Sequence, residues 1–205
     1  GHLDQTPATA DEASDRFRAD PDDPAPACPV TAARPLMAAT WAPIDQRHIE
    51  ERDDVLVYTS EPLAEPLTFA GNAAAKLFDS ADTPDADWVV KLIDVHPDGF
   101  AQNLTVGILR GSFRESESHP TPLEPNKIYE VTIDLGPIAA RIGEGHRVRV
   151  DICGACFPLF DRNPNTAEGP FGNLSAVSTE QVYHDRTRHS RILLPCQTPA
   201  SSSDI

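Results

Sequence analysis

The chain has 205 residues, which is enough for one substantial domain with its own hydrophobic core. Acidic residues outnumber basic ones by 32 to 17, and the formal net charge of -15 argues against nucleic acid or an anionic membrane as partner, because both are bound chiefly through Lys and Arg. No run of about 18 apolar residues predicts a transmembrane helix, and no basic segment followed by an apolar one predicts a signal peptide, so we expect a cytoplasmic protein.

Both ends of the chain are polar and lack hydrophobic periodicity. Residues 1–27 are rich in Asp, Ala and Pro, and we expect them to form an extended or disordered arm. The acidic cluster from Asp20 to Asp23 lacks the Gly and the terminal Glu of a calcium-binding loop, so we interpret it as a solvated charge run. Residues 197–205 predict a disordered tail, which leaves residues 28–196 for the folded domain.

The first half of this domain has the pattern of β-strands. Residues 55–60 are a short β-branched run, and residues 67–80 predict one long strand that Gly71 interrupts. Residues 85–95 are apolar on both faces, which is typical of a strand that is covered on both sides.

The second half continues the pattern after a strong turn signal at residues 97–99. Residues 100–113 return from this turn as the partner strand of a hairpin. Residues 127–135 and 146–152 alternate between apolar and polar side chains, with Val131 and Ile133 on one face and Glu130 and Thr132 on the other. Such alternation indicates a sheet with one face on a core and one face in water.

Two short strands are expected at residues 181–185 and 191–196, and one brief helix is expected at residues 137–142, before Gly143 and Gly145. About eight or nine strands with almost no helix predict an all-β fold. Within this class, the pattern predicts a β-sandwich of the jelly-roll, galactose-binding-domain-like type, without a second domain.

Two cysteines, Cys153 and Cys156, have C-x-x-C spacing. No second C-x-x-C pair or His pair completes a four-ligand zinc site, and Phe157-Pro158 does not begin the helix that a thioredoxin-like redox motif requires. We therefore expect ordinary strand-end thiols, no metal ligands and no cofactor.

Catalytic motifs are also missing. The G-x-S-x-G elbow of serine hydrolases does not occur, and no two histidines stand at i+2 or i+4. His184 precedes Asp185, which resembles half of a catalytic triad, but neighbours on a strand point to opposite faces. We therefore expect His184 to cap a turn, and we predict no catalytic residue.

A polar loop follows the apolar strand that ends near Cys153. Asp161, Arg162 and Asn163 could bind a small polar ligand or an ion, or they could fix a crossover between two sheets through charge-assisted hydrogen bonds. We favour the structural loop, because Asn163-Pro164 and Asn165-Thr166 add turn chemistry.

The motifs of this chain resemble those of the C-terminal domain of CocE/NonD hydrolases, the family of cocaine esterases, α-amino-acid ester hydrolases and X-Pro dipeptidyl-peptidases. The resemblance extends over residues 17–196, and its elements occur in the family's order. They are DQRHIEERDDVLVYTSEPL, KLIDVHPDG, GILRGSFRES, LEPNKIYEVTIDL, GHRVRVDI, FPLFDRNPNT, VYHD and HSRILLP.

This resemblance implies a non-catalytic jelly roll that packs on an α/β-hydrolase domain, where the family's Ser, Asp and His lie. By position, Leu36 and Met37 match the segment that reaches the family's substrate pocket, and Trp41 would join the same domain contact; plain core packing is the alternative for all three. The parent protein would be a serine esterase or a dipeptidyl-peptidase-like enzyme, and the isolated chain would be inactive.

The resemblance leaves other properties open. The domain could form a homo-oligomer, and its uncovered face should be apolar enough for self-association. One alternative function is a stand-alone jelly-roll module that binds carbohydrate or another ligand. Another is a small enzyme that uses His184 or the cysteine pair.

Overall fold

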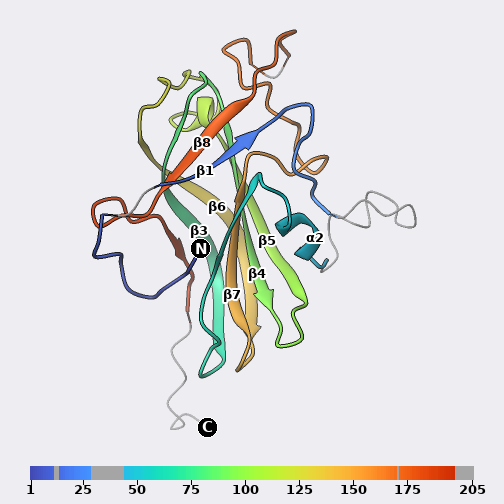
Figure 1. Cartoon of the computed structure of the whole chain (residues 1–205), viewed down its shortest axis with the longest axis vertical. Helices are drawn as coiled ribbons and strands as arrows, with labels where there is room; N and C mark the ends of the chain where they lie inside the picture. The colour runs from blue at the N-terminus through green and yellow to red at the C-terminus, as the bar shows by residue number, and fades with distance from the viewer. Residues whose placement is uncertain (12–13, 29–43, 170, 197–205) are drawn as a thin grey trace, which may run out of the picture.

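The computed structural model describes residues 1–11, 14–28, 44–169 and 171–196. These residues form nine strands and two short helices (Figure 1). The elements are β1 (Asp15–Ala19), α2 (Arg47–Glu50), β2 (Val55–Thr59), β3 (Leu67–Ala81), β4 (Asp87–Val95), β5 (Ala101–Arg110), the 3-10 helix η1 (Gly111–Phe113), β6 (Tyr129–Ile142), β7 (Arg147–Cys153), β8 (Ser178–Tyr183) and β9 (Arg191–Leu193).

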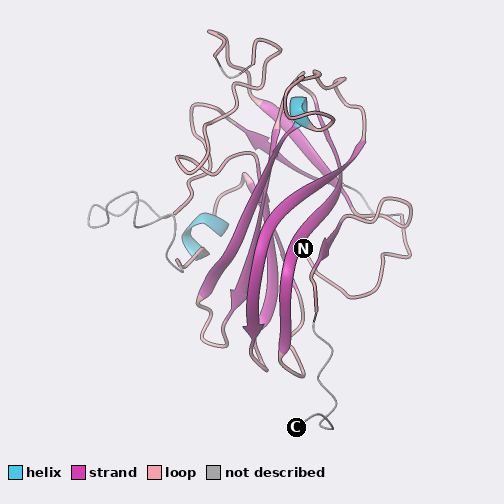
Figure 2. Cartoon of the chain, turned by 180° about the vertical axis from the view of Figure 1, so that it is seen from behind, coloured by secondary structure: helices cyan, strands magenta, loops and turns pink. Residues whose placement is uncertain are grey.

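The strands form two antiparallel sheets that face each other (Figure 2). One sheet has the order β1-β8-β3-β6, with β9 also on β3, and the other has the order β2-β7-β4-β5. The pairs are nested around the turn between β4 and β5, so that β3 pairs with β6, β2 with β7 and β1 with β8. This is the strand order of a jelly roll, and it confirms the predicted all-β sandwich.

The main core lies between the sheets. Trp88 and Val90 of β4 pack there with Leu77 of β3 and with Val131 and Ile133 of β6. The alternating side chains of β6, Glu130, Thr132 and Asp134, are exposed. The predicted alternation of this strand is thus confirmed, and its sheet presents a polar face to water.

The outer face of the four-stranded sheet is covered by the chain itself. Val89 of β4 and Cys153 of β7 form a second apolar cluster with Ala25, Ala27 and Ile49, which come from the segments on either side of residues 29–43. Every residue of β4 is consequently buried, as the sequence predicted for a strand covered on both sides.

The helix predicted at residues 137–142 is wrong, because these residues continue β6. Gly136 has a φ of 75°, and the register between β3 and β6 shifts at this point, between Ala73 and Ala74. Such a bulge moves the inward phase of the strand by one residue, so Ile138 and Ile142 point to the core although they break the preceding alternation. The shift hid the strand pattern in the sequence.

Gly71 does not interrupt β3, contrary to our expectation. It pairs with Ile138 of β6 within a continuous strand and has a φ of 140°. A Cβ atom at this position would lie 3.1 Å from Cβ of Pro195, so the glycine allows the chain near the C-terminus to approach the strand closely.

The expected N-terminal arm needs correction in part, because residues 15–19 belong to the sandwich, whereas residues 4–11 form no strand and are largely exposed. Residues 15–19 are strand β1 and pair with β8, with Phe17 and Ala19 buried and Arg16 and Arg18 facing outward. The alternating segment has only five residues and is surrounded by Asp and Pro residues, so its pattern was too short to predict a strand. The predicted tail at residues 197–205 lies outside the described residues.

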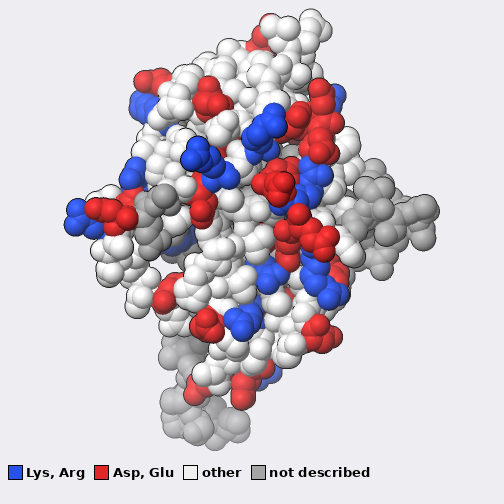
Figure 3. Space-filling model, in the orientation of Figure 1, with Lys and Arg blue, Asp and Glu red and all other residues white. Residues whose placement is uncertain are grey.

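Charged side chains of both signs are interspersed on the face seen in Figure 3, where many Lys and Arg side chains lie beside Asp or Glu. Among the described residues, none of the helices has the length and apolar character needed to cross a bilayer.

Candidate functional site

The segment that carries the predicted pocket residues starts and ends at one place on the molecule. Leu36, Met37 and Trp41 lie outside the described residues, within residues 29–43. The flanking residues Cys28 and Ile44 are buried and pack on each other. These two flanks, residues 20–28 and 44–54, are called the anchor region below.

The first flank is held by the loop that follows β7. The amide of Ala27 donates to the carbonyl of Phe157 at 2.8 Å, and the amide of Phe157 donates to Ala25 at 2.9 Å. Arg162 donates from the same loop to the carbonyl of Pro21 at 2.8 Å. The chain that enters residues 29–43 is thus fixed by a short backbone ladder.

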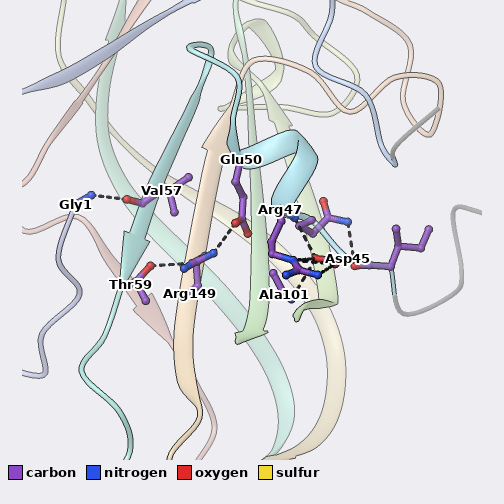
Figure 4. A network of polar contacts seen from close by, with 10 residues as sticks. Gly1, Asp45, Arg47, Glu50, Val57, Thr59, Ala101 and Arg149 are labelled. Carbon is purple, nitrogen blue, oxygen red and sulfur yellow. Dashed lines mark hydrogen bonds and ion pairs between the residues drawn. The ribbon is translucent and has the colours of Figure 1, made fainter. Parts of the chain in front are cut away.

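The second flank is held by the start of β5 (Figure 4). The amide of Gln46 donates to the carbonyl of Ala101 at 2.9 Å, and the Ala101 amide donates to Oδ1 of Asp45 at 3.3 Å. Arg47 contacts the same Asp45 carboxylate through both Nε and a terminal nitrogen. These contacts place α2 directly after the point where the chain returns.

A buried lysine lies beneath the anchor region. Lys91 of β4 donates to Oε1 of Gln46 at 3.0 Å, and only 1% of its surface is exposed. Asp151, its cross-strand neighbour on β7, is also fully buried, and its oxygens have no hydrogen-bond partner among the described residues. Burial, and secondarily the charge of Glu50, raises the pKa of Asp151 to about 7.

An ion pair connects α2 to the same strand. Oε2 of Glu50 accepts from Arg149 at 2.5 Å, and Nε of Arg149 donates to Oγ1 of Thr59 at 2.8 Å (Figure 4). Burial nevertheless raises the pKa of Glu50, against the opposing effect of Arg149. The other oxygen of Glu50, Oε1, is buried and has no hydrogen-bond partner among the described residues, so this pair contributes little net stability. Its contacts join α2 to β7 beside the second flank.

The polar loop of the sequence analysis adjoins this region. Nδ2 of Asn163 donates to the buried carboxylate of Asp87 at 2.7 Å, and Arg110 binds both oxygens of Asp87 at 2.8 Å. The carbonyl of Asp161 accepts from Arg110 at 3.2 Å. All these contacts join the loop to other residues of the chain. They support the predicted structural role of Asp161, Arg162 and Asn163, which remains a prediction.

An open groove runs between β5 and the loop after β7, and exposed Phe157 belongs to the same loop. Its lining combines apolar side chains with the charged side chains of Arg110, Glu117 and Asp161. Its lining residues are Ile108, Leu109, Arg110, Phe113, Glu117, Leu159, Phe160 and Asp161. Such a groove suits a protein surface better than a small ligand, because it is wide and open.

The cysteine pair has no feature of a reactive site. Cys153 and Cys156 are free and buried, and Sγ of Cys153 lies 3.1 Å from the carbonyl of Ala155. Burial raises the pKa of Cys153 to about 12 and also raises the pKa of Cys156. Both thiols are therefore protonated at neutral pH and are poor nucleophiles.

His184 and Asp185 do not form a pair. Nε2 of His184 lies 3.0 Å from a carboxylate oxygen of Asp15, which also accepts from the hydroxyl of Tyr58 at 2.8 Å. Asp185 instead accepts from Thr187 and Arg188 in the turn that follows. Asp15 is 169 residues away from His184 in the sequence, so no local signal could have identified it.

One cluster was missed by the sequence analysis. Asp94, His96 and His146 bring ligand atoms within 4.8 Å of one another. The search for paired histidines overlooked it, because His146 is distant in the sequence and the near neighbour of His96 is an Asp.

The comparison with family models gives one match for nearly the whole chain. Residues 2–193 match the family described as the X-Pro dipeptidyl-peptidase C-terminal non-catalytic domain. Among curated proteins, the cocaine esterase of Rhodococcus sp. (strain MB1 Bresler) is 40% identical over 187 residues, which are 91% of this chain and 31% of the esterase.

Solved structures agree with this match. An aminopeptidase from a marine-sediment Thaumarchaeota archaeon aligns with a TM-score of 0.89 and 35% identity, over 97% of this chain and 35% of that one. An α-amino acid ester hydrolase aligns with a TM-score of 0.87 and 36% identity, over 94% of this chain and 34% of that one. The chain thus spans about a third of the length of these relatives.

Proposed function

Since this chain belongs to the family of X-Pro dipeptidyl-peptidase C-terminal non-catalytic domains, we propose that it packs on an α/β-hydrolase domain and completes the substrate pocket of that domain. It is the non-catalytic β-sandwich of a CocE/NonD-type hydrolase. The parent protein is proposed to be a serine hydrolase that cleaves an ester or an amide, since the relatives named above are two ester hydrolases and an aminopeptidase.

The single observation that carries this proposal is the family match over residues 2–193, and the contact between Cys28 and Ile44 supports the position of the pocket segment. Residues 29–43 leave and rejoin the domain at one fixed point, which the buried Lys91 and the backbone ladder at Phe157 support. We propose that Leu36 and Met37 reach the substrate pocket from there, and that Trp41 packs at the domain contact.

The neighbouring surface supports the same orientation. The groove beside β5 and exposed Phe157 offer apolar area next to the anchor region. The outer face of β6, in contrast, presents Glu130, Thr132 and Asp134 to water. We propose that the hydrolase domain lies against the groove beside β5 and the loop after β7, while the outer face of the other sheet stays in water.

The first experiment treats the purified chain with a fluorophosphonate probe and with p-nitrophenyl esters. The proposal expects no labelled serine and no turnover. Stoichiometric labelling of one serine would mean that this chain has its own nucleophile, and it would overturn the assignment of catalysis to another domain.

A second experiment tests the pocket directly. The matching third of the Rhodococcus esterase is replaced by this chain, and the chimaera is assayed with Leu36→Glu and Met37→Glu. We expect both changes to raise KM or lower kcat in a folded chimaera, whereas Ile128→Glu, at an exposed apolar side chain near the start of β6, should not. Equal kinetics in all three variants would contradict the proposed role of Leu36 and Met37.

Sugar binding, the alternative function, has little support among the described residues. Trp88 is fully buried in the core and cannot stack on a sugar ring, and Trp41 lies outside the described residues. Binding of the isolated chain on a glycan array would revive this alternative.

A further inference from the structure

The lower end of the sandwich in Figure 1, where β4 ends and β7 begins, carries a cluster of two imidazoles and one carboxylate. Asp94 is the last but one residue of β4, His96 follows the strand, and His146 immediately precedes β7. Val95 pairs with Arg147, and this register brings the two histidines to the same end of the sheet.

We propose that Asp94, His96 and His146 form a binding site for one first-row transition-metal ion of the Zn²⁺ type. Each residue offers one ligand atom, and these atoms lie within 4.8 Å of one another. The proposal concerns this chain alone and is independent of the proposed hydrolase partner.

The distances between donor atoms suit such an ion. Nδ1 of His146 lies 2.7 Å from Oδ1 of Asp94, and Nε2 of His96 lies 3.7 Å from Oδ2. Zinc bonds of about 2.0–2.1 Å in a tetrahedron separate neighbouring ligands by about 3.4 Å. These two distances lie on either side of this value, but they join different oxygens of Asp94, and the three ligand atoms spread over as much as 4.8 Å. Binding therefore requires the side chains to draw together around the ion.

The rings are already held in place. His96 packs edge-on against Phe100 with ring centroids 5.3 Å apart, and its ring lies 4.5 Å from that of His146. The His146 ring also lies against Gly143, where a Cβ atom would be 3.1 Å from it. Preorganised ligands lose little conformational freedom on binding, which favours affinity.

The donor set selects the class of ion. Imidazole nitrogens combined with a carboxylate suit Zn²⁺, Co²⁺ or Ni²⁺, whereas Ca²⁺ and Mg²⁺ prefer oxygen ligands throughout. Oε1 of Gln102 lies 3.3 Å from Nε2 of His96 and offers a fourth ligand atom, or a water molecule would supply it. The His96 side chain is 32% exposed and leaves a path for the ion.

A bound ion would have a structural effect, because the three ligands come from the ends of two paired strands. It would join the end of β4 to the start of β7 and stabilise the folded chain in proportion to its occupancy. No chemical step is implied.

The test uses the full chain, free of any affinity tag and treated with a chelator. Zn²⁺ is titrated in competition with a chromophoric zinc chelator, and the melting temperature is measured with and without Zn²⁺. The variants are His96→Gln and Asp94→Asn. The matched control is His184→Gln. Among the described residues, His184 is the other part-buried histidine that contacts an aspartate, and this aspartate is Asp15.

We expect one equivalent of Zn²⁺ to bind and to raise the melting temperature. Either ligand variant should weaken binding by at least about tenfold and abolish the temperature shift, while His184→Gln should change neither. Unchanged zinc affinity in folded His96→Gln, or an equal shift in all proteins, would overturn the site. His96→Asn replaces His96→Gln if the latter does not fold, and Ca²⁺ should give no shift.

Discussion

At the scale of single residues, Asp79 and Glu180 stand out as carboxyl groups inside the sandwich. Both are fully buried, and none of their oxygens has a hydrogen-bond partner among the described residues. Burial raises the pKa of each well above its ordinary value, and the charge of the neighbouring Asp87 raises that of Glu180 further. Both groups are therefore protonated in the folded chain under conditions in which they ionise in the unfolded chain.

This difference predicts a pH dependence of stability. The folded state retains a proton on Glu180 that the unfolded state releases above about pH 4.3, so the free energy of unfolding falls as the pH rises from there towards the folded pKa. Glu180→Gln removes this loss and should stabilise the chain at pH 8 relative to pH 4, by about 1.4 kcal/mol for each unit by which the folded pKa exceeds the unfolded pKa. Urea unfolding at both pH values measures the difference.

Glu130→Gln serves as the control for this prediction, because Glu130 is exposed on β6. It should leave the pH dependence unchanged. Equal slopes of stability against pH in the wild-type chain and in Glu180→Gln would show that Glu180 is not the group responsible.

Asn163 carries a second residue-scale prediction. Its side chain donates to Asp87 and accepts from the amide of Asn165 at 2.9 Å, and it is buried. Asn163→Ala leaves both groups without this partner and should cost about 1–3 kcal/mol of unfolding free energy in chemical denaturation. Arg162→Ala, at a half-exposed side chain, should cost less than about 1 kcal/mol. If Asn163→Ala leaves the unfolding free energy unchanged, the alternative of a ligand-binding loop is open again.

Residue contacts of this kind were only partly predictable. The sequence correctly separated His184 from Asp185, since alternation on a strand is a local rule. It could not identify Asp15 as the partner of His184, or His146 as the neighbour of Asp94, because those contacts depend on how distant strands pair.

At the scale of elements, β6 shows where local rules fail. Residues 137–142 begin with a proline, contain two alanines and precede Gly143, all of which are typical of a helix. Pairing with β3 along 13 residues of β6 overrides these propensities. Strand β7 has regular alternation without a bulge and was correctly predicted. The short β1 was missed because of the Asp- and Pro-rich sequence around it.

Gly136 of β6 and Gly107 of β5 give the element-scale prediction. Gly136 has positive φ but open space around it, so Gly136→Ala should cost only the backbone strain, about 1 kcal/mol. At Gly107 a Cβ atom would lie 2.2 Å from the carbonyl oxygen of Asp134. Gly107→Ala must therefore separate β5 from β6 and should cost about 3 kcal/mol or prevent folding. Thermal unfolding of both variants tests this order, and equal losses would contradict it.

At the scale of the whole molecule, the jelly roll and its family were predictable, because many ordered motifs agree with them. The site was predictable only as a position along the chain. Leu36, Met37 and Trp41 were assigned by resemblance, while the features that anchor their segment, Lys91 under Gln46 and the contact of Cys28 with Ile44, arise from tertiary packing.

A domain that normally covers or is covered by another should expose apolar side chains when it is alone, and this predicts self-association of the purified chain. Phe171 is 96% exposed and Leu174 is 63% exposed in the loop before β8. Burying two such side chains between copies gains about 25 cal/mol per Å² of apolar surface, which favours weak association.

Light scattering over a concentration series should show the mean mass rising, and Phe171→Ser combined with Leu174→Ser should reduce that rise. Leu193→Ser, at a less exposed leucine of β9, is the control and should leave it unchanged. A constant monomer mass at the highest soluble concentration would mean that this loop is not an association surface.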